Sequence, residues 1–214
     1  MQEDKTMRIL LVSVLLCGLL YATAEAQTKK ELAIGTPMPL ADRPMKNIDG
    51  RVLTLNDLKG EKGLVVVFWS NTCPWVAKYE DRLLELARTY QEKGFGFVVV
   101  NANDPRAYPQ ESLEEMKKRA TSRGYPFPYL VDEGSVLAAT YGATRTPHVY
   151  VFDAEGKLVY VGAIDDSPAD PSQVERAYLK EVLEAMVAGK EVPLTHSRAF
   201  GCTIKWYTGQ AGSK

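Results

Sequence analysis

Two uninterrupted apolar runs dominate the chain, GLVVVFWS at residues 63–70 and FGFVVVNAN at residues 95–103. Runs of this kind, without alternating polar residues, are typical of strands buried on both faces of a sheet. Between them, apolar residues recur at helical spacing, which predicts a helix that begins near Pro74 and ends by Gly94. A strand–helix–strand unit joins parallel strands by a right-handed crossover, so the pattern indicates an α/β fold.

The remaining patterns predict shorter elements around this unit. Turn dipeptides mark two hairpins, capping-box pairs mark two helix starts, and a proline-rich strand is expected away from the sheet centre. Together they indicate a sandwich with a mixed central sheet and an N-terminal hairpin. In chain order the elements are a hairpin at 43–60 turning at Asp49-Gly50, a helix from the Ser112/Glu115 capping box to about Arg123, a strand at 125–132, a short helix at 135–142, a hairpin at 148–164 turning at Glu155-Gly156, and a helix from the Ser172/Glu175 capping box to Gly189.

The N-terminal segment has the pattern of a secretory signal peptide. Residues 1–26 combine a basic start, an apolar run at 9–20 and an Ala-Glu-Ala cleavage motif. The run is short for a bilayer span, so we expect no stable membrane span after cleavage, although an uncleaved membrane anchor is the alternative. We therefore expect an exported, periplasmic protein that begins at Gln27, with one domain at 27–189 and an irregular tail at 190–214.

Composition narrows the function classes. The chain has 26 basic and 27 acidic residues and no basic run, which gives no electrostatic reason to expect nucleic acid as a partner. Outside the signal segment the cysteines are Cys73 and Cys202. In an exported protein two cysteines can form one bridge, or one can react while the other resolves it. Two cysteines and two histidines offer few ligands from which to build a zinc site, so we expect no metal and no cofactor.

Cys73 has the sequence position of a reactive cysteine. It follows the strand at 63–70 and precedes the helix that begins near Pro74. The free N–H groups and the positive end of the helix dipole favour a thiolate at this position. A thiolate is the nucleophile in disulfide exchange and the species that peroxide oxidises. The alternative interpretation is a buried structural cysteine.

Two motifs carry a resemblance to a known family. The strand–turn–helix GLVVVFWSNTCPWV and the loop and hairpin TRTPHVYVFDAEGKLVYVGAIDDS are similar to the thioredoxin superfamily, and the similarity extends from about Ala33 to Asp166. More narrowly, the chain resembles peroxiredoxin-like redoxin proteins of the alkyl hydroperoxide reductase and thiol-specific antioxidant type. The tail RAFGCTIKW resembles the end of one subgroup. The resemblance implies a thioredoxin-like α/β/α sandwich with a single active-site cysteine.

The resemblance also implies roles for individual residues. Cys73 matches the attacking cysteine of the thioredoxin Cys-x-x-Cys motif. Pro147 matches a cis-proline that family members place against this cysteine, where the preceding backbone can bind an extended peptide. We therefore expect Trp75, Thr146 and Pro147 to form a substrate-binding surface.

The chain departs from both standard motifs of the family. Val76 stands at the second cysteine of the dithiol motif, and Val66 stands at the proline of the peroxiredoxin motif. Cys73 could then be resolved by Cys202 or by an external thiol, or its sulfenic acid could report or scavenge peroxide. The leading hypothesis is an exported thiol-dependent oxidoreductase, active in thiol–disulfide exchange or peroxide reduction, with a thiol or disulfide protein or a small peroxide as partner. The alternative is a non-catalytic thioredoxin-like binding module.

Two charged or titratable residues flank the Thr-Pro motif and are weaker candidates. Arg145 could stabilise a thiolate or a peroxide oxygen, but a solvated loop charge is the favoured interpretation. His148 could move a proton near Cys73, but a histidine on a strand surface is favoured.

Overall fold

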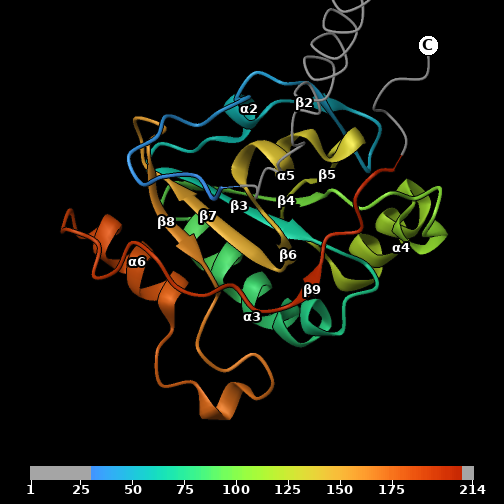
Figure 1. Cartoon of the computed structure of the whole chain (residues 1–214). Helices are drawn as coiled ribbons and strands as arrows, with labels where there is room; N and C mark the ends of the chain where they lie inside the picture. Colours follow the sequence, from blue (N-terminus) through green and yellow to red (C-terminus); the bar gives the residue numbers. More distant parts are fainter. Residues whose placement is uncertain (1–29, 209–214) are drawn as a thin grey trace, which may run out of the picture.

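The structure is a computed structural model that describes residues 30–208. The predicted signal segment, the first residues of the predicted domain and the end of the tail lie outside this range. Within the range, no helix is both long and apolar enough to cross a membrane. The chain folds around a central sheet of seven strands with helices on both faces (Figure 1).

The two apolar runs form neighbouring strands at the middle of this sheet, as the sequence predicted. They are β3 (Gly63–Trp69) and β4 (Phe95–Asn101), and every residue of β3 is buried. The two strands are parallel, and α3 (Pro74–Gln91) makes the crossover between them. On its other side β3 pairs antiparallel with β7 (His148–Phe152), so the sheet is mixed.

The other elements complete the sheet and cover it. The strand order is β2-β1-β5-β4-β3-β7-β8. Its remaining strands are β1 (Met45–Asn47), β2 (Val52–Leu53), β5 (Tyr129–Val131) and β8 (Leu158–Gly162). The other helices are α2 (Leu55–Leu58), α4 (Leu113–Arg123), α5 (Val136–Tyr141) and α6 (Tyr178–Val187), with 3-10 turns η1 (Pro109–Glu111), η2 (Glu133–Ser135) and η3 (Pro171–Gln173). A separate two-stranded sheet joins β6 (Arg145–Thr146) to β9 (Cys202–Thr203).

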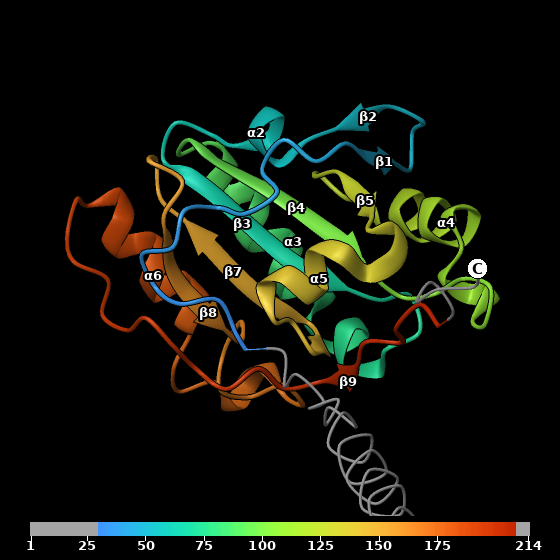
Figure 2. The ribbon, with the colours of Figure 1, turned by 45° about the horizontal axis from the view of Figure 1, so that its top comes forward.

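Buried apolar side chains divide between the two faces of the sheet. The helices α3, α4 and α6 pack on one face through core residues that include Leu83, Met116 and Leu183. The helices α2 and α5 pack on the other face through Leu55 and Tyr141. Figure 2 shows α5 in front of the sheet and α3 behind it. The expected α/β/α sandwich with an N-terminal hairpin is therefore confirmed, since β1 and β2 pair antiparallel.

The proline-rich strand lies deeper in the sheet than the sequence predicted. We expected a strand at 125–132 away from the centre, but β5 lies between β1 and β4 and pairs with both. The reason is that Pro126 and Pro128 precede β5, so each residue of the strand keeps its N–H group for pairing.

The two predicted helix caps are not formed as expected. Ser112 precedes α4, but its side chain makes no capping hydrogen bond. The last helix begins at Tyr178 rather than near Ser172. Asp166 accepts hydrogen bonds from the backbone N–H groups of Glu175 and Arg176, which holds this stretch in a loop before α6.

The fold predicts that α3 is held to the sheet by its apolar face. Leu83→Ala removes a side chain that is 1% exposed, and a core truncation of this type costs about 2–5 kcal/mol of unfolding free energy. The matched control Glu85→Ala, on the exposed face of the same helix, should change stability by less than about 0.5 kcal/mol. Urea unfolding followed by tryptophan fluorescence compares the two variants, and equal midpoints would contradict this packing.

Candidate active site

Cys73 lies between the end of β3 and the start of α3. It is the N-cap residue of α3, with Pro74 in the first turn, and its side chain is 2% exposed. Its Sγ donates a hydrogen bond to the backbone oxygen of Thr146 at 3.1 Å. The peptide bond from Thr146 to Pro147 is cis, as the sequence predicted. The cysteine and the Thr-Pro motif, far apart in sequence, are thus in direct contact.

The C-terminal tail adds a strand to this motif. We expected an irregular tail, but β9 of the tail lies beside β6 (Figure 1) and pairs with it antiparallel. In this register Cys202 is the partner of Thr146. Because Thr146 also contacts Cys73, the pairing brings the two cysteines together. Both are free thiols in this structure. The tail forms a strand because β6 offers it unpaired backbone groups, a long-range condition that the local sequence pattern does not contain.

Cys202 is the more accessible of the two thiols. Its side chain is half-buried against the core cluster that contains Cys73. Partial burial, followed by the neighbouring Cys73 thiol, raises the pKa of Cys202 to about 11. Cys202 is therefore protonated at neutral pH.

Val76 occupies the position that a dithiol motif gives to its second cysteine. Its side chain is fully buried in the core beneath α3. Val76 therefore contributes to core packing and provides no thiol at this position. Any resolving thiol within residues 30–208 must therefore come from Cys202.

A buried carboxylate, Glu111, organises the loop before Cys73. Glu111 is 2% exposed, and both of its oxygens are used. Oε1 accepts from the hydroxyl groups of Ser70 and Thr72, both at 2.6 Å. Oε2 accepts from the backbone N–H of Asn71 at 2.9 Å and from Nδ2 of Asn101 at 3.0 Å. These bonds fix residues 70–72, which hold Cys73 at the start of the helix.

Lys205 of the tail completes this network. Its Nζ lies 3.1 Å from Oε1 of Glu111 and also donates to the hydroxyl of Thr72. Burial by itself would raise the pKa of Glu111. The hydrogen bonds from Ser70 and Thr72 and the charge of Lys205 outweigh that effect, so the pKa of Glu111 lies below its ordinary value. The carboxylate is charged at neutral pH and ties the tail to the active-site loop.

Sequence analysis missed both members of this ion pair. Glu111 stands immediately before Ser112, whose pattern predicts a capping box, and Lys205 stands in a tail expected to be irregular. The resemblance of the RAFGCTIKW tail to a redoxin subgroup indicates that this segment matters. It does not indicate which residue Lys205 contacts.

The predicted substrate surface is partly covered by the tail. Trp75 packs edge-on against Phe200, with ring centroids 4.6 Å apart. Thr146 pairs with Cys202, and Pro147 follows directly in the chain. Arg145 is half-buried, and its Nη1 donates to the backbone oxygen of Gly201 at 3.1 Å. Arg145 is therefore not a simply solvated loop charge, since it binds the tail.

His148 is not the surface histidine that the sequence favoured. It is 2% exposed, because β7 is an interior strand of the sheet with both faces covered. Its Nε2 lies 3.1 Å from a carboxylate oxygen of Glu31. The other oxygen of Glu31 lies 2.9 Å from Nε2 of His196, which joins the N-terminal arm to the tail. No hydrogen bond between His148 and Cys73 is present among the described residues.

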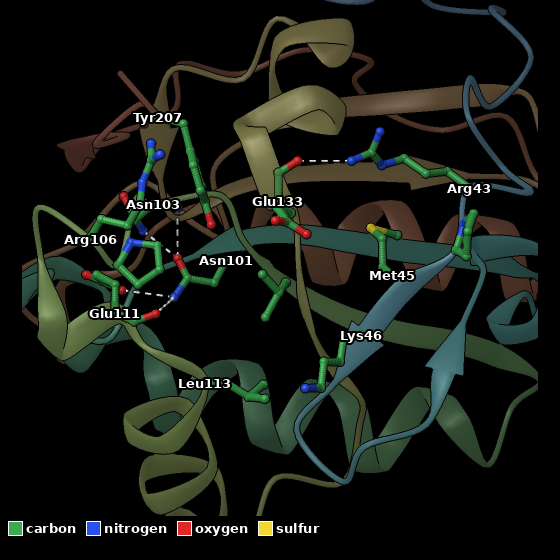
Figure 3. A pocket seen from close by; sticks show the side chains of 13 residues that line it. Arg43, Met45, Lys46, Asn101, Asn103, Arg106, Glu111, Leu113, Glu133 and Tyr207 are labelled. Atoms are coloured by element: carbon green, nitrogen blue, oxygen red, sulfur yellow. Dashed lines mark hydrogen bonds between the residues drawn. The ribbon is translucent and has the colours of Figure 1, made fainter. Parts of the chain in front are cut away.

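A cavity of about 360 Å³ adjoins the Glu111 network (Figure 3). Glu111 and Asn101 line it, and so does Tyr207 of the tail. Its cationic lining residues are Arg43, Lys46 and Arg106, and none of them belongs to the Thr-Pro motif. Neither cysteine lines the cavity, so it is separate from the thiol pair.

Comparison with known proteins identifies the family. A model of the Redoxin family matches residues 33–178, well over half of the chain. The chain belongs to the redoxin family. This match confirms the resemblance to the thioredoxin superfamily that the Cys-Pro and Thr-Pro motifs indicated. Cys202 and Lys205 lie beyond the matched residues.

Individual relatives of this redoxin-family chain are consistent with that result. The thiol-disulfide oxidoreductase ResA of Bacillus thuringiensis (strain Al Hakam) is 29% identical over 131 residues, which cover 61% of this chain and 70% of the relative. The thiol:disulfide interchange protein DsbE of Pseudomonas aeruginosa is 31% identical over 137 residues, which cover 62% and 68%. The crystal structure of an uncharacterized conserved protein from Geobacillus kaustophilus is 39% identical, with a TM-score of 0.77, and covers 83% of this chain and 94% of that chain. The matches place the chain among the thiol-dependent oxidoreductases of the superfamily.

The network predicts that Glu111→Gln destabilises the protein in a pH-dependent way. At pH 7 the variant should lose about 2–3 kcal/mol, because Lys205 and the hydroxyl donors lose a charged acceptor. A carboxyl whose folded pKa is lowered contributes stability above its unfolded pKa, and this stability is lost as the pH falls through the folded value. The difference from wild type should therefore shrink below about pH 4.

Denaturant unfolding at pH 7 and at pH 3 measures this difference. The matched control Glu114→Gln, on the exposed side of α4, should leave stability unchanged at both values. A Glu111→Gln loss that is equal at both pH values would argue against a charged Glu111.

Proposed function

We propose that the protein is a thiol-dependent oxidoreductase in which Cys73 is the nucleophile and Cys202 is the resolving thiol. The observation that carries the proposal is the antiparallel register of β6 with β9. It sets Cys202 opposite Thr146, the residue whose carbonyl accepts the hydrogen bond from Cys73. A thiol pair built from a helix start and a tail strand would replace the dithiol motif that Val76 interrupts.

In thiol–disulfide exchange the cycle has two steps. The Cys73 thiolate attacks one sulfur of a substrate disulfide, forms a mixed disulfide and releases the other substrate sulfur as a thiolate. Cys202 then loses its proton and attacks the Cys73 sulfur, which forms the Cys73–Cys202 disulfide and releases the second substrate thiolate. The substrate disulfide gains two electrons, and the enzyme loses them. The names of the relatives ResA and DsbE support this chemistry.

The order of attack follows from the protonation of Cys202. A thiol whose pKa is raised to about 11 is a poor first nucleophile at neutral pH. Once Cys73 carries a disulfide, Cys202 needs to lose its proton as it attacks. Lys205, whose positive charge lowers the pKa of Cys202, favours that loss. The protonation of Cys202 therefore supports Cys73 as the first residue to react.

Peroxide reduction is a second candidate, favoured by the burial of Cys73. With the tail in place, Cys73 is 2% exposed, so a small oxidant reaches it more readily than a folded protein does. The Cys73 thiolate would attack a peroxide oxygen to give a sulfenic acid and an alcohol or water. Cys202 would then displace the sulfenic oxygen as water and form the same disulfide.

The redox proposal predicts distinct products for three chains. After a stoichiometric dose of oxidised glutathione or hydrogen peroxide, denaturing alkylation and intact mass should show wild type as a monomer that has lost two hydrogens and both reactive thiols. Cys202→Ser should stop at a glutathionyl or sulfenic adduct on Cys73. Cys73→Ser should stay unreacted at pH 7, because Cys202 is protonated there.

Each departure from this pattern has a definite meaning. An adduct on Cys73 of wild type with a free Cys202 would exclude Cys202 as resolver and leave an external thiol in that role. If glutathione reacts and peroxide does not, disulfide exchange is the activity. Two unreactive thiols would overturn the enzyme proposal in favour of a non-catalytic binding module that uses the surface around Trp75 and Pro147.

We also propose that the protein is exported to a periplasm-like compartment, on the basis of the signal pattern at residues 1–26. Expression of the full chain in a bacterium with a periplasm should yield a soluble periplasmic form whose intact mass corresponds to a start at Gln27. Ala26→Phe, which removes the small residue of the cleavage motif, should keep the segment attached. A wild-type chain that retains residues 1–26 in the membrane fraction would instead support the membrane anchor.

A further inference from the structure

We propose that a pocket between the N-terminal arm, β6 and the tail binds the phosphate or carboxylate group of a small molecule, and that this ligand holds the tail on the domain. The pocket, here named the arm pocket, has a volume of about 420 Å³, and its lining includes Glu31, Arg145, His148, His196 and Arg198. Neither cysteine lines it. The proposal concerns the position of the tail and does not require that Cys202 resolves Cys73.

Positive charge exceeds negative charge in the arm pocket. Arg145 and Arg198 supply two guanidinium groups, and Glu31 is the one carboxylate among the lining residues. Burial would raise the pKa of Glu31, but its contacts with the two histidines outweigh that effect and hold the pKa below its ordinary value. With Glu31 charged and both histidines neutral, the lining carries a net positive charge, so it attracts an anion.

The two guanidinium groups keep donors that the protein does not use. Arg145 donates from Nη1 to the Gly201 oxygen at 3.1 Å. Arg198 is exposed, and its side chain makes no hydrogen bond or ion pair within residues 30–208. A guanidinium carries five N–H donors and binds phosphate or carboxylate through two of them at a time. These donors therefore select an oxyanion rather than a neutral ligand.

His148 adds a buried polar side chain to the wall of the arm pocket. The residue is 2% exposed. Its Nδ1 has no hydrogen-bond partner within residues 30–208, and its Nε2 lies 3.1 Å from Glu31 without the alignment of a hydrogen bond. Buried polar atoms normally have a partner. A ligand oxygen in the arm pocket would provide an acceptor for this ring.

Backbone contacts hold the walls of the arm pocket in place. On the arm, the N–H of Leu32 donates to the Tyr141 oxygen at 3.0 Å. On the tail, the N–H of Ser197 donates to the Val161 oxygen at 3.0 Å, and the N–H of Val161 donates to the Thr195 oxygen at 3.1 Å. The lining residues of the arm and the tail thus stand on anchored segments, so the arm pocket is largely formed before a ligand binds.

A ligand in the arm pocket would contact segments that are distant in sequence. Arg145 belongs to β6, whereas His196 and Arg198 belong to the tail, shortly before β9. A ligand that contacts both segments binds the docked tail more tightly than a detached tail, so it shifts the equilibrium toward docking. Because Cys73 is buried with the tail in place, occupancy of the arm pocket keeps this thiol covered.

Binding is measured first, by titration calorimetry on the purified mature protein with reduced thiols. The probes are inorganic phosphate and citrate, each compared with sodium chloride at the same ionic strength. Arg198→Gln is the test variant, because its side chain has no partner within residues 30–208 to lose. Lys190→Gln is the matched control, because it removes the same charge from an exposed position of the tail outside the arm pocket.

We expect wild type and Lys190→Gln to bind at least one probe with equal affinity. Arg198→Gln should bind that probe about tenfold more weakly, because it loses a bidentate charged contact. The tighter probe identifies the ligand group as phosphate or carboxylate. Glu31→Gln keeps an acceptor beside the histidines but removes a like charge, so it should bind about threefold more tightly. A purely structural role for Glu31 would not tighten binding.

The effect on the tail is measured by alkylation of Cys73 in a Cys202→Ser background, followed by intact mass. Because Cys73 is 2% exposed, iodoacetamide reaches it when the tail opens. A probe at ten times its Kd should slow this alkylation about tenfold, since an opened tail no longer forms the arm pocket. At the same probe concentration, Arg198→Gln should show a slowing of about twofold or less.

Three results would overturn the site: binding of neither probe, equal affinities for wild type and Arg198→Gln, or equal weakening by Lys190→Gln. Weaker binding by Glu31→Gln would contradict an anion seated beside Glu31. Binding that requires Arg198 but leaves alkylation unchanged would refute the claim that the ligand holds the tail. The proposed function is judged separately, because formation of the Cys73–Cys202 disulfide needs no probe.

Discussion

The antiparallel pairing of Cys202 with Thr146 is the contact on which the whole site depends. The Thr146 backbone accepts the hydrogen bond from Cys73, pairs with the tail and leads into the cis peptide bond to Pro147. Gly201 has to be a glycine because the tail passes so close to this same residue. Three segments that are distant in sequence, the start of α3, β6 and β9, are thereby held at one point.

A buried ion pair reinforces this meeting point from the other side. Glu111 binds the loop that precedes Cys73, and Lys205 follows directly after β9 on a short stretch of the tail. A buried carboxylate is stable in this place because its oxygens accept several hydrogen bonds and face a cation. The same charge that fixes the loop therefore also fixes the tail, so Glu111 and Lys205 together hold the segments that carry the two thiols.

The second thiol of the proposed redox pair comes from the tail and not from the helix that carries Cys73. In a Cys-x-x-Cys motif both thiols belong to one helix turn, and the pair forms whenever the helix does. Here the two cysteines meet because the tail pairs with β6, so in the proposed mechanism the thiol chemistry depends on that strand pairing. Val76 packs in the core and leaves the helix position without a thiol, so the proposed mechanism assigns the resolving role to Cys202 of the tail.

Local pattern was enough to predict much of this architecture. The buried runs of β3 and β4, the helix start at Pro74 and the Thr-Pro motif are visible in short windows, because burial periodicity and backbone restrictions act within a few residues. On these grounds the sequence determined the α/β sandwich and the presentation of Cys73 at a helix start. Tertiary structure alone decided the interior place of β5, the burial of His148, the Glu111–Lys205 pair and the docking of Cys202. Each of these depends on a partner more than 80 residues away or on a neighbouring strand, and no short-range pattern encodes which distant groups a folded chain brings within hydrogen-bond distance.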